Sequence, residues 1–173
     1  MSIIYCKRSI DVGANWEGDI RMNDTPYHSR HPQIVTTSEG QVCCLWEDGQ
    51  YHDGSSWLGD AALYITFRWP WADLDQTKTY HIINASNGQA THAKSYASGS
   101  CIHVVWTDSS GDSHGSQAVY YMLSPDGGVT WKNPEQLAIA AGINAEGVAG
   151  TGTYAVALIG ASGGLHYLRR DFT

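Results

Sequence analysis

Histidine, aspartate and aromatic side chains concentrate in four polar segments of the chain, residues 25–32, 47–60, 84–94 and 108–116. These segments hold five of the eight histidines. Imidazole, carboxylate and guanidinium groups can hydrogen-bond sugar hydroxyls, while tyrosine and tryptophan rings can stack on the apolar face of a sugar ring. The candidate ligand-binding residues are therefore Tyr27, His28, Arg30, His31, Asp48, Tyr51, His52, Asp53, Trp57, His92, Asp108, Asp112 and His114.

Three interpretations of these residues stay open. They form a site for a carbohydrate or another small ligand, they bind a metal ion, or they are ordinary solvent-exposed loop residues. The sequence HSRH at residues 28–31 is not the HExxH pattern of a zinc site, and the other candidates come from separate loops. We therefore expect a small-ligand site with no metal and no cofactor.

Composition narrows the classes of partner. The net charge is −7 and the ten Lys and Arg residues form no block, so a nucleic-acid-binding surface is not expected. No apolar run reaches the roughly 18 residues of a membrane span. The apolar stretch at the N-terminus is too short for a signal peptide, which predicts a cytoplasmic protein unless a leader has been removed. The four cysteines lack CxxC spacing and are expected to be buried thiols.

The chain contains internal repeats. SIDVGANW (9–16) matches SPDGGVTW (124–131), which begins 115 positions later, and QVCCLWED (41–48) matches CIHVVWTD (101–108) at a spacing of 60. TYAVALIGASGG (153–164) is a third copy of the latter without the tryptophan, and LYITFRWPW (63–71) supplies a strand in a middle unit. The repeated Trp46 and Trp106 are expected in the core between units.

Each repeat unit reads as four short strands separated by Gly, Asn, Asp and Ser. The clearest unit has strands at about 93–97, 100–107, 117–124 and 134–140. This pattern predicts an all-β, single-domain β-propeller segment over 1–173 rather than a two-sheet sandwich. Its three blades are residues 33–91, 92–145, and 146–173 combined with 1–32.

Closure of the ring needs more strands than one chain provides. We count thirteen strands, or about three blades, whereas propellers usually have four to eight. We expect two chains to form a six-bladed ring as a homodimer; the alternative is that the chain is part of a longer propeller.

The repeated octet is best explained as a turn. Short Ser and Asp side chains bond backbone amides, Gly permits positive φ, and Trp covers the turn. Both octets resemble Asp-boxes, the bacterial neuraminidase repeat of sialidases and related β-propellers, with Asn15 standing where Thr is usual. The predicted structural residues are Ser9, Asp11, Gly13, Trp16, Ser124, Asp126, Gly128 and Trp131.

The resemblance implies that Asp-boxes join third and fourth strands on the face away from the active site, so the candidate ligand-binding residues lie on the opposite face. Sialidases bind the substrate carboxylate with three arginines, but only Arg30 is expected on that face. FRWP (67–70) is similar to the family's Phe/Tyr-Arg-Ile-Pro motif, yet it falls at the end of a third strand. We therefore expect a non-catalytic carbohydrate- or small-ligand-binding module with no assigned catalytic residues; the alternatives are a sialidase-like glycoside hydrolase and a protein-interaction scaffold.

Overall fold

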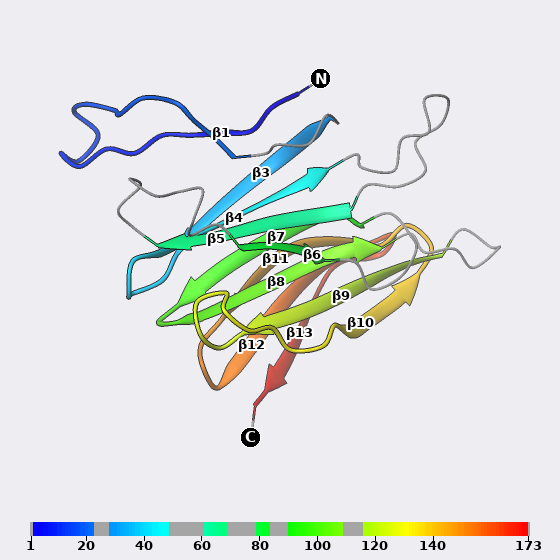
Figure 1. Ribbon diagram of the computed structural model, residues 1–173. Helices are drawn as coiled ribbons and strands as arrows, with labels where there is room; N and C mark the ends of the chain where they lie inside the picture. Colours follow the sequence, from blue (N-terminus) through cyan, green and yellow to red (C-terminus); the bar gives the residue numbers. More distant parts are fainter. Residues whose placement is uncertain are drawn as a thin grey trace.

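A computed structural model describes residues 2–22, 28–48, 61–68, 79–83, 90–108 and 116–172. Over these residues the chain forms thirteen strands and no helix (Figure 1). The strands are β1 (Tyr5–Cys6), β2 (Ile20–Arg21), β3 (Ser29–Thr36), β4 (Gln41–Asp48), β5 (Ala61–Arg68), β6 (Thr79–Ile83), β7 (Ala90–Ser98), β8 (Cys101–Asp108), β9 (Gln117–Ser124), β10 (Glu135–Ala140), β11 (Asn144–Gly150), β12 (Tyr154–Ala161) and β13 (Gly164–Asp171). The described residues contain no helix with the length and apolarity needed to cross a membrane.

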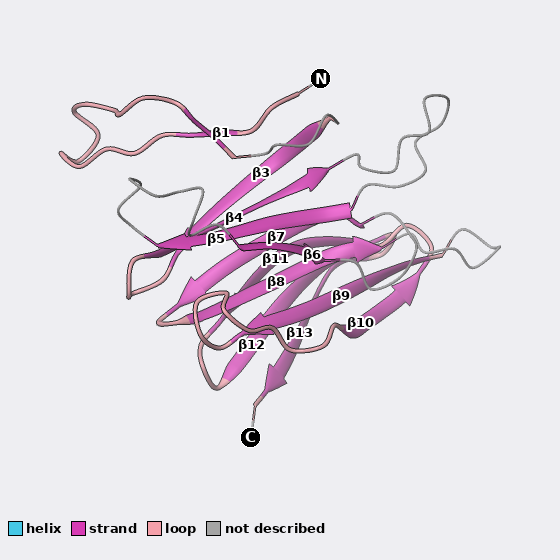
Figure 2. Cartoon of the chain, viewed as in Figure 1, coloured by secondary structure: helices cyan, strands magenta, loops and turns pink. Residues whose placement is uncertain are grey.

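The strands form four antiparallel sheets in chain order (Figure 2). Two complete sheets, β3-β4-β5-β6 and β7-β8-β9-β10, lie between the β1-β2 pair and the three-stranded sheet β11-β12-β13. The first strands of successive sheets are neighbours in space, because β7 contacts both β3 and β11. This arrangement confirms the predicted all-β fold of small four-stranded blades.

The second strand of each complete sheet is buried on both faces, which explains its nearly continuous apolar sequence. Cys43 and Leu45 of β4 face the β7–β10 sheet, whereas Cys44 and Trp46 face the β1-β2 pair. Successive side chains of a strand point to opposite faces, so one apolar run fills two inter-sheet cores. Trp106 of β8 is likewise fully buried, as expected for an inter-blade tryptophan.

Three hydrophobic cores hold the four sheets together. The core between the second and third sheets contains Ala93, Ile102, Val104 and Met122. The next core joins Val119 and Tyr121 to the last sheet, where its partners are Ile143, Ala145, Ala155, Ala157 and Ile159. The first strand of the last sheet, β11, lies closest to β7 and β8.

The second Asp-box is a closed hydrogen-bonded turn between β9 and β10. Ser124 Oγ accepts from the Gly128 amide at 2.7 Å, and Asp126 accepts from the Thr130 amide and hydroxyl at 2.8 and 2.6 Å. Burial acts to raise the pKa of Asp126, but the hydrogen bonds from Thr130 and Ser124 outweigh it and hold this pKa below its usual value. Trp131 donates its indole N–H to the Gly128 carbonyl at 3.2 Å. The carboxylate is thus used within the turn, as predicted.

The first Asp-box makes the same contacts between β1 and β2. Ser9 Oγ accepts from the Gly13 amide at 2.7 Å, and Asp11 accepts from the Asn15 amide at 2.8 Å. The Asn15 side chain donates to Asp11 at 2.6 Å and so replaces the usual Thr hydroxyl. Hydrogen bonds from Asn15 hold the pKa of Asp11 below its usual value. Trp16 is 61% exposed, so this box covers less apolar surface than the second.

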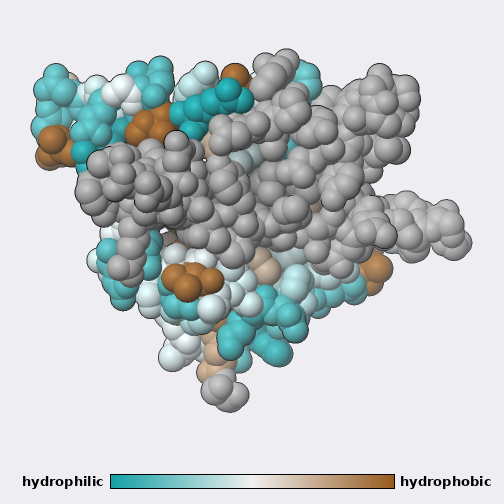
Figure 3. Space-filling view, viewed as in Figure 1, coloured by the Kyte–Doolittle hydropathy of each residue, from teal (hydrophilic) through white to brown (hydrophobic). Residues whose placement is uncertain are grey.

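Both ends of the sheet series expose apolar side chains. Ile10 and Val12 are exposed in the β1–β2 segment, where apolar side chains reach the surface in Figure 3. Leu165 and Tyr167 are exposed on β13, which is the edge strand of its sheet. Of the four free cysteines, Cys43 and Cys44 are buried as expected, but Cys6 and Cys101 are only partly buried.

Candidate functional site

The first strands of the two complete sheets contain the same irregularity. The pairing of β3 with β4 shifts between Arg30 and Gln33, and the pairing of β7 with β8 shifts between Thr91 and Lys94. Each shift places one extra residue in the first strand, which is a β-bulge. The bulges occupy equivalent positions in the two repeats, and in the β7–β10 sheet this is the end opposite the Asp-box turn.

A histidine with a left-handed backbone lies in each bulge. The φ angles are 52° for His31 and 55° for His92. Positive φ is uncommon for residues other than glycine and costs of order 1–3 kcal/mol. Both side chains are exposed, so apolar packing does not compensate for this cost. Strained residues of this kind concentrate at functional sites, and bulges redirect side chains beside such sites.

Glu47 of β4 connects the two bulges. Its carboxylate is 2% exposed, and Oε2 accepts from Arg30 Nε at 3.0 Å and lies 2.9 Å from His31 Nδ1. The other oxygen, Oε1, accepts from the backbone amide of His92 at 2.8 Å. One buried carboxylate therefore positions two candidate ligand-binding residues of β3 and the backbone of the third, His92, in the neighbouring sheet.

These contacts define what the cluster can do chemically. The side chains of Arg30 and His31 are 47% and 67% exposed, so they meet solvent beside the buried acid. The cluster thus presents a guanidinium donor beside an oriented imidazole. We call Arg30, His31, Glu47 and His92 the bulge cluster.

Asp48 and Asp108 end β4 and β8 at repeat-equivalent positions, and both are buried to 1% exposure or less. Asp48 Oδ2 accepts from the Ser29 hydroxyl at 2.9 Å and from the Trp46 indole at 3.2 Å. This aspartate holds the first residue of β3 against β4. Because Ser29 directly precedes Arg30, this hydrogen bond fixes the position of the strand segment that carries the bulge cluster.

The next inter-sheet junction uses a neutral group. Thr107, the repeat equivalent of Glu47, accepts from the Ala145 amide at 2.8 Å through Oγ1. Ala145 lies at the bulge of β11. The same backbone link therefore recurs with a neutral hydroxyl in place of the Glu47 carboxylate, and the residue in this bulge is Glu146 rather than a histidine.

The remaining predicted ligand-binding residues are more dispersed. The His28 ring nitrogen Nδ1 lies 3.2 Å from Ser2 Oγ, next to the start of β3. Seven predicted residues lie outside the described part of the chain: Tyr27, Tyr51, His52, Asp53, Trp57, Asp112 and His114. Among the described residues, no three His, Cys, Asp or Glu side chains form a group suited to a metal ion.

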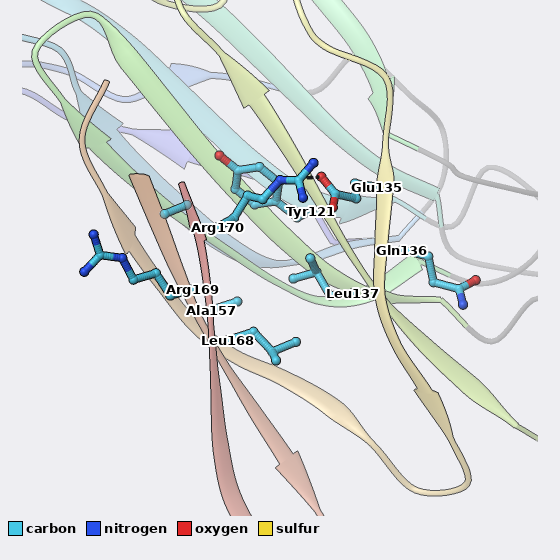
Figure 4. Close-up of a pocket in the computed structure, with 9 residues that line it drawn as sticks. Tyr121, Glu135, Gln136, Leu137, Ala157, Leu168, Arg169 and Arg170 are labelled. Carbon is cyan, nitrogen blue, oxygen red and sulfur yellow. Dashed lines mark ion pairs between the residues drawn. The ribbon is translucent and has the colours of Figure 1, made fainter. Parts of the chain in front are cut away.

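A cavity of about 170 Å³ lies elsewhere, between β9–β10 and the last sheet (Figure 4). Its lining includes Tyr121, Leu168 and the pair Glu135–Arg170, whose Oε2 and Nε atoms lie 3.5 Å apart. Beneath it, buried His103 shares a 2.9 Å hydrogen bond with the Tyr121 hydroxyl. Burial lowers the pKa of His103 to about 4 and raises that of Tyr121, so both are neutral at pH 7.

Sequence reasoning missed Glu47 as the organising residue. Its signal was its place directly before Asp48, at the end of a buried strand that pairs with the strand of Arg30. The strain at His31 and His92 had no signal in a single sequence, because histidine is also common in ordinary loops.

Comparison with known proteins places this geometry in a family. No curated protein matches the chain. The model of a family described as BNR repeat-containing matches residues 4–165, which spans both Asp-boxes and all three inter-sheet cores. The chain is a member of the BNR repeat-containing family, in the sialidase-like β-propeller superfamily.

Proposed function

We propose that the protein is a non-catalytic module that binds a carbohydrate or another small ligand at the bulge cluster, on the face opposite the Asp-boxes. The observation that carries this proposal is the pair of exposed, left-handed histidines at equivalent bulges, His31 and His92. Their positive φ angles cost conformational energy, and because both side chains are exposed, no apolar packing offsets this cost.

The chemistry of the cluster suits a hydroxyl-rich ligand. Arg30 offers N–H donors, and the imidazole of His31, held beside Glu47, carries ring nitrogens that donate or accept according to the tautomer. Sugar hydroxyls both donate and accept, so mixed donors and acceptors at a strand end provide suitable partners. The predicted aromatic residues Tyr27, Tyr51 and Trp57 belong to the same hypothesis as stacking groups.

A glycoside hydrolase is the second candidate, and the Glu47–His31 pair favours it. A carboxylate that orients an imidazole is a common arrangement for a general base. The described arginines argue against a sialidase mechanism: Arg8 pairs with Glu17 beside the first Asp-box, and Arg169 pairs with Asp171 at the end of β13. Arg68 ends β5, the third strand of its sheet.

A glycan array combined with a fluorogenic sialoside assay tests the two candidates. Binding without turnover supports the module, and turnover supports the hydrolase. If neither binding nor turnover is seen, a scaffold for protein partners remains as the function. His166→Ala, an exposed histidine on β13, is the matched control for His31→Ala, because it removes an imidazole from a different sheet.

We also propose that two copies associate as a homodimer. The support is β13, an edge strand that exposes Leu165 and Tyr167 at 65% and 73%. Edge strands with exposed apolar residues readily pair with another chain. Sedimentation should give twice the 18.9 kDa mass of one chain, and Tyr167→Lys should shift it towards the monomer; a wild-type monomer at all concentrations would exclude the dimer.

A further inference from the structure

Two cysteines from distant parts of the sequence meet at the junction of the N-terminal hairpin and the first complete sheet. Cys44 lies in the middle of β4 and is buried in the core it forms with Ile4, Met22, Val42 and Trp46. Cys6 of β1 packs against this core from the other side and is partly exposed. Neither forms a disulfide, and the two thiols lie close enough for each to shift the pKa of the other.

The two thiols differ in a way that suits sequential oxidation. The hydrogen bond from Cys44 lowers the pKa of Cys6 to about 7, with a smaller contribution from the Lys7 backbone, although partial burial opposes the shift. The hydrogen bond with Cys6, together with burial, raises the pKa of Cys44. Thiolate character and exposure govern oxidation by peroxides. Cys6 has both properties, and Cys44 is a protonated thiol next to it.

The other cysteines lack this combination. Burial alone raises the pKa of Cys43 to about 12, and this residue points into the opposite core. Cys101 lies in β8 and packs against the core on the far side of the β7–β10 sheet. They are therefore natural internal controls.

We propose that Cys6 and Cys44 form a thiol oxidation site, in which Cys6 reacts with a hydroperoxide and Cys44 resolves the product as an intramolecular disulfide. In the first step the Cys6 thiolate attacks the terminal peroxide oxygen and the O–O bond breaks, which gives Cys6 sulfenic acid and an alkoxide, or hydroxide where the oxidant is hydrogen peroxide. In the second step Cys44 sulfur attacks the Cys6 sulfur, the S–O bond breaks, and the Cys44 proton leaves with the hydroxyl as water. Two thiols lose two electrons in total and the peroxide gains them.

The bond would fasten the hairpin that bears the first Asp-box to the strand that carries Glu47. Residues 6 and 44 are 38 positions apart, and a cross-link over such a loop restricts the unfolded chain. The hairpin contributes few packed residues, and its exposed Trp16 shows how little of its surface is covered. The segment before it also contacts the site, because the Ser29 amide donates to the Ser2 carbonyl at 3.2 Å.

The test is peroxide treatment of the purified chain, followed by titration of free thiols in denaturant and peptide mapping by mass spectrometry. We expect the free thiols to fall from four to two, and a Cys6–Cys44 link to appear in monomeric chains. Mapping in the Cys43→Ala background separates the two neighbouring cysteines of β4. Cys44→Ala should stop the reaction at a sulfenic acid on Cys6 that dimedone traps, and Cys6→Ser should abolish both products.

A second measurement tests the reactivity of Cys6 directly. The alkylation rate of Cys6 by iodoacetamide in Cys44-containing protein should rise with a midpoint near pH 7, and the midpoint should move towards the ordinary thiol range in Cys44→Ala. A wild-type chain that keeps four thiols under peroxide, or a disulfide that involves Cys43 or Cys101, overturns the proposal. An unchanged alkylation midpoint in Cys44→Ala overturns it as well.

Discussion

Glu47 Oε1 in β4 accepts a 2.8 Å hydrogen bond from the backbone amide of His92 in β7, across the junction of two blades. Its second oxygen holds Arg30 and His31 in its own blade. Buried carboxylates are costly unless they are paired, and here two hydrogen bonds and the His31 contact all come from residues at the two bulges. Stability and the shape of the proposed ligand face therefore depend on the same group.

Glu47→Gln tests this dependence. The amide oxygen can still accept from His92, but the amide nitrogen cannot accept from Arg30 and His31. We expect a loss of about 1–3 kcal/mol in the free energy of unfolding, measured by urea denaturation. Glu135→Gln is the matched control, since its pair with Arg170 is exposed and should change stability by less than about 1 kcal/mol. Equal effects of the two substitutions would contradict the assigned role of Glu47.

The two Asp-boxes differ at one strained position. Val12 has a φ of 59° and is fully exposed, and its equivalent in the second box is Gly127 with a φ of 71°. A β-branched residue is disfavoured there, so Val12→Gly should raise the free energy of unfolding by about 1 kcal/mol. The reverse change, Gly127→Val, should destabilise the protein, because a Cβ at Gly127 would collide with the Gln41 side chain. Thermal unfolding gives the stability of both variants relative to the wild type. A Val12→Gly protein less stable than the wild type would show that the first turn is not strained.

Acid should destabilise the protein through His103. Burial lowers the pKa of this histidine from its ordinary value of 6.5 to about 4 in the folded state. Its contribution to stability is therefore complete above pH 6.5 and is lost as the pH falls towards 4, by about 3 kcal/mol at most. Urea midpoints between pH 7 and 4 measure this loss.

Substitution identifies the titrating group. His103→Gln should flatten the pH dependence between 6.5 and 4, even if it lowers stability at pH 7 through lost stacking on Phe172. His166→Gln, at an exposed position on β13, should keep the wild-type slope. A slope that is unchanged in His103→Gln would assign the acid sensitivity to another residue.

The repeat made the fold predictable from one sequence. QVCCLWED and CIHVVWTD identified the buried second strands, and the two octets identified the turns between third and fourth strands, because strand alternation and turn chemistry are local properties of the chain. The expected number of thirteen strands agrees with the strands of the described residues.

The site was less predictable, because it depends on contacts between blades. Arg30, His31 and His92 were proposed from their types, but the link through Glu47 joins residues 45 positions apart and appears only when the blades pack. Asp48 was proposed for the same site from its position, and in the structure its carboxylate holds Ser29 and Trp46. Residue type alone does not distinguish an aspartate that contacts a ligand from one that positions a strand.

His92→Gly separates the proposed function from stability. Glycine adopts positive φ without strain, and the backbone amide that donates to Glu47 is retained. We expect the free energy of unfolding to stay the same or rise by up to about 1 kcal/mol. Ligand binding should weaken, because the imidazole side chain is absent. A large loss of stability would show that the side chain of His92 is needed for folding.

Glycan-array profiles of the wild type and of Arg30→Ala with His92→Gly, compared at matched folded fractions, test the central claim most directly. The bulge cluster as a ligand site predicts that the wild type binds a defined set of glycans and that the double variant loses them, with His166→Ala unchanged. Retention of the wild-type profile by the double variant, or no binding by the folded wild type, would contradict it.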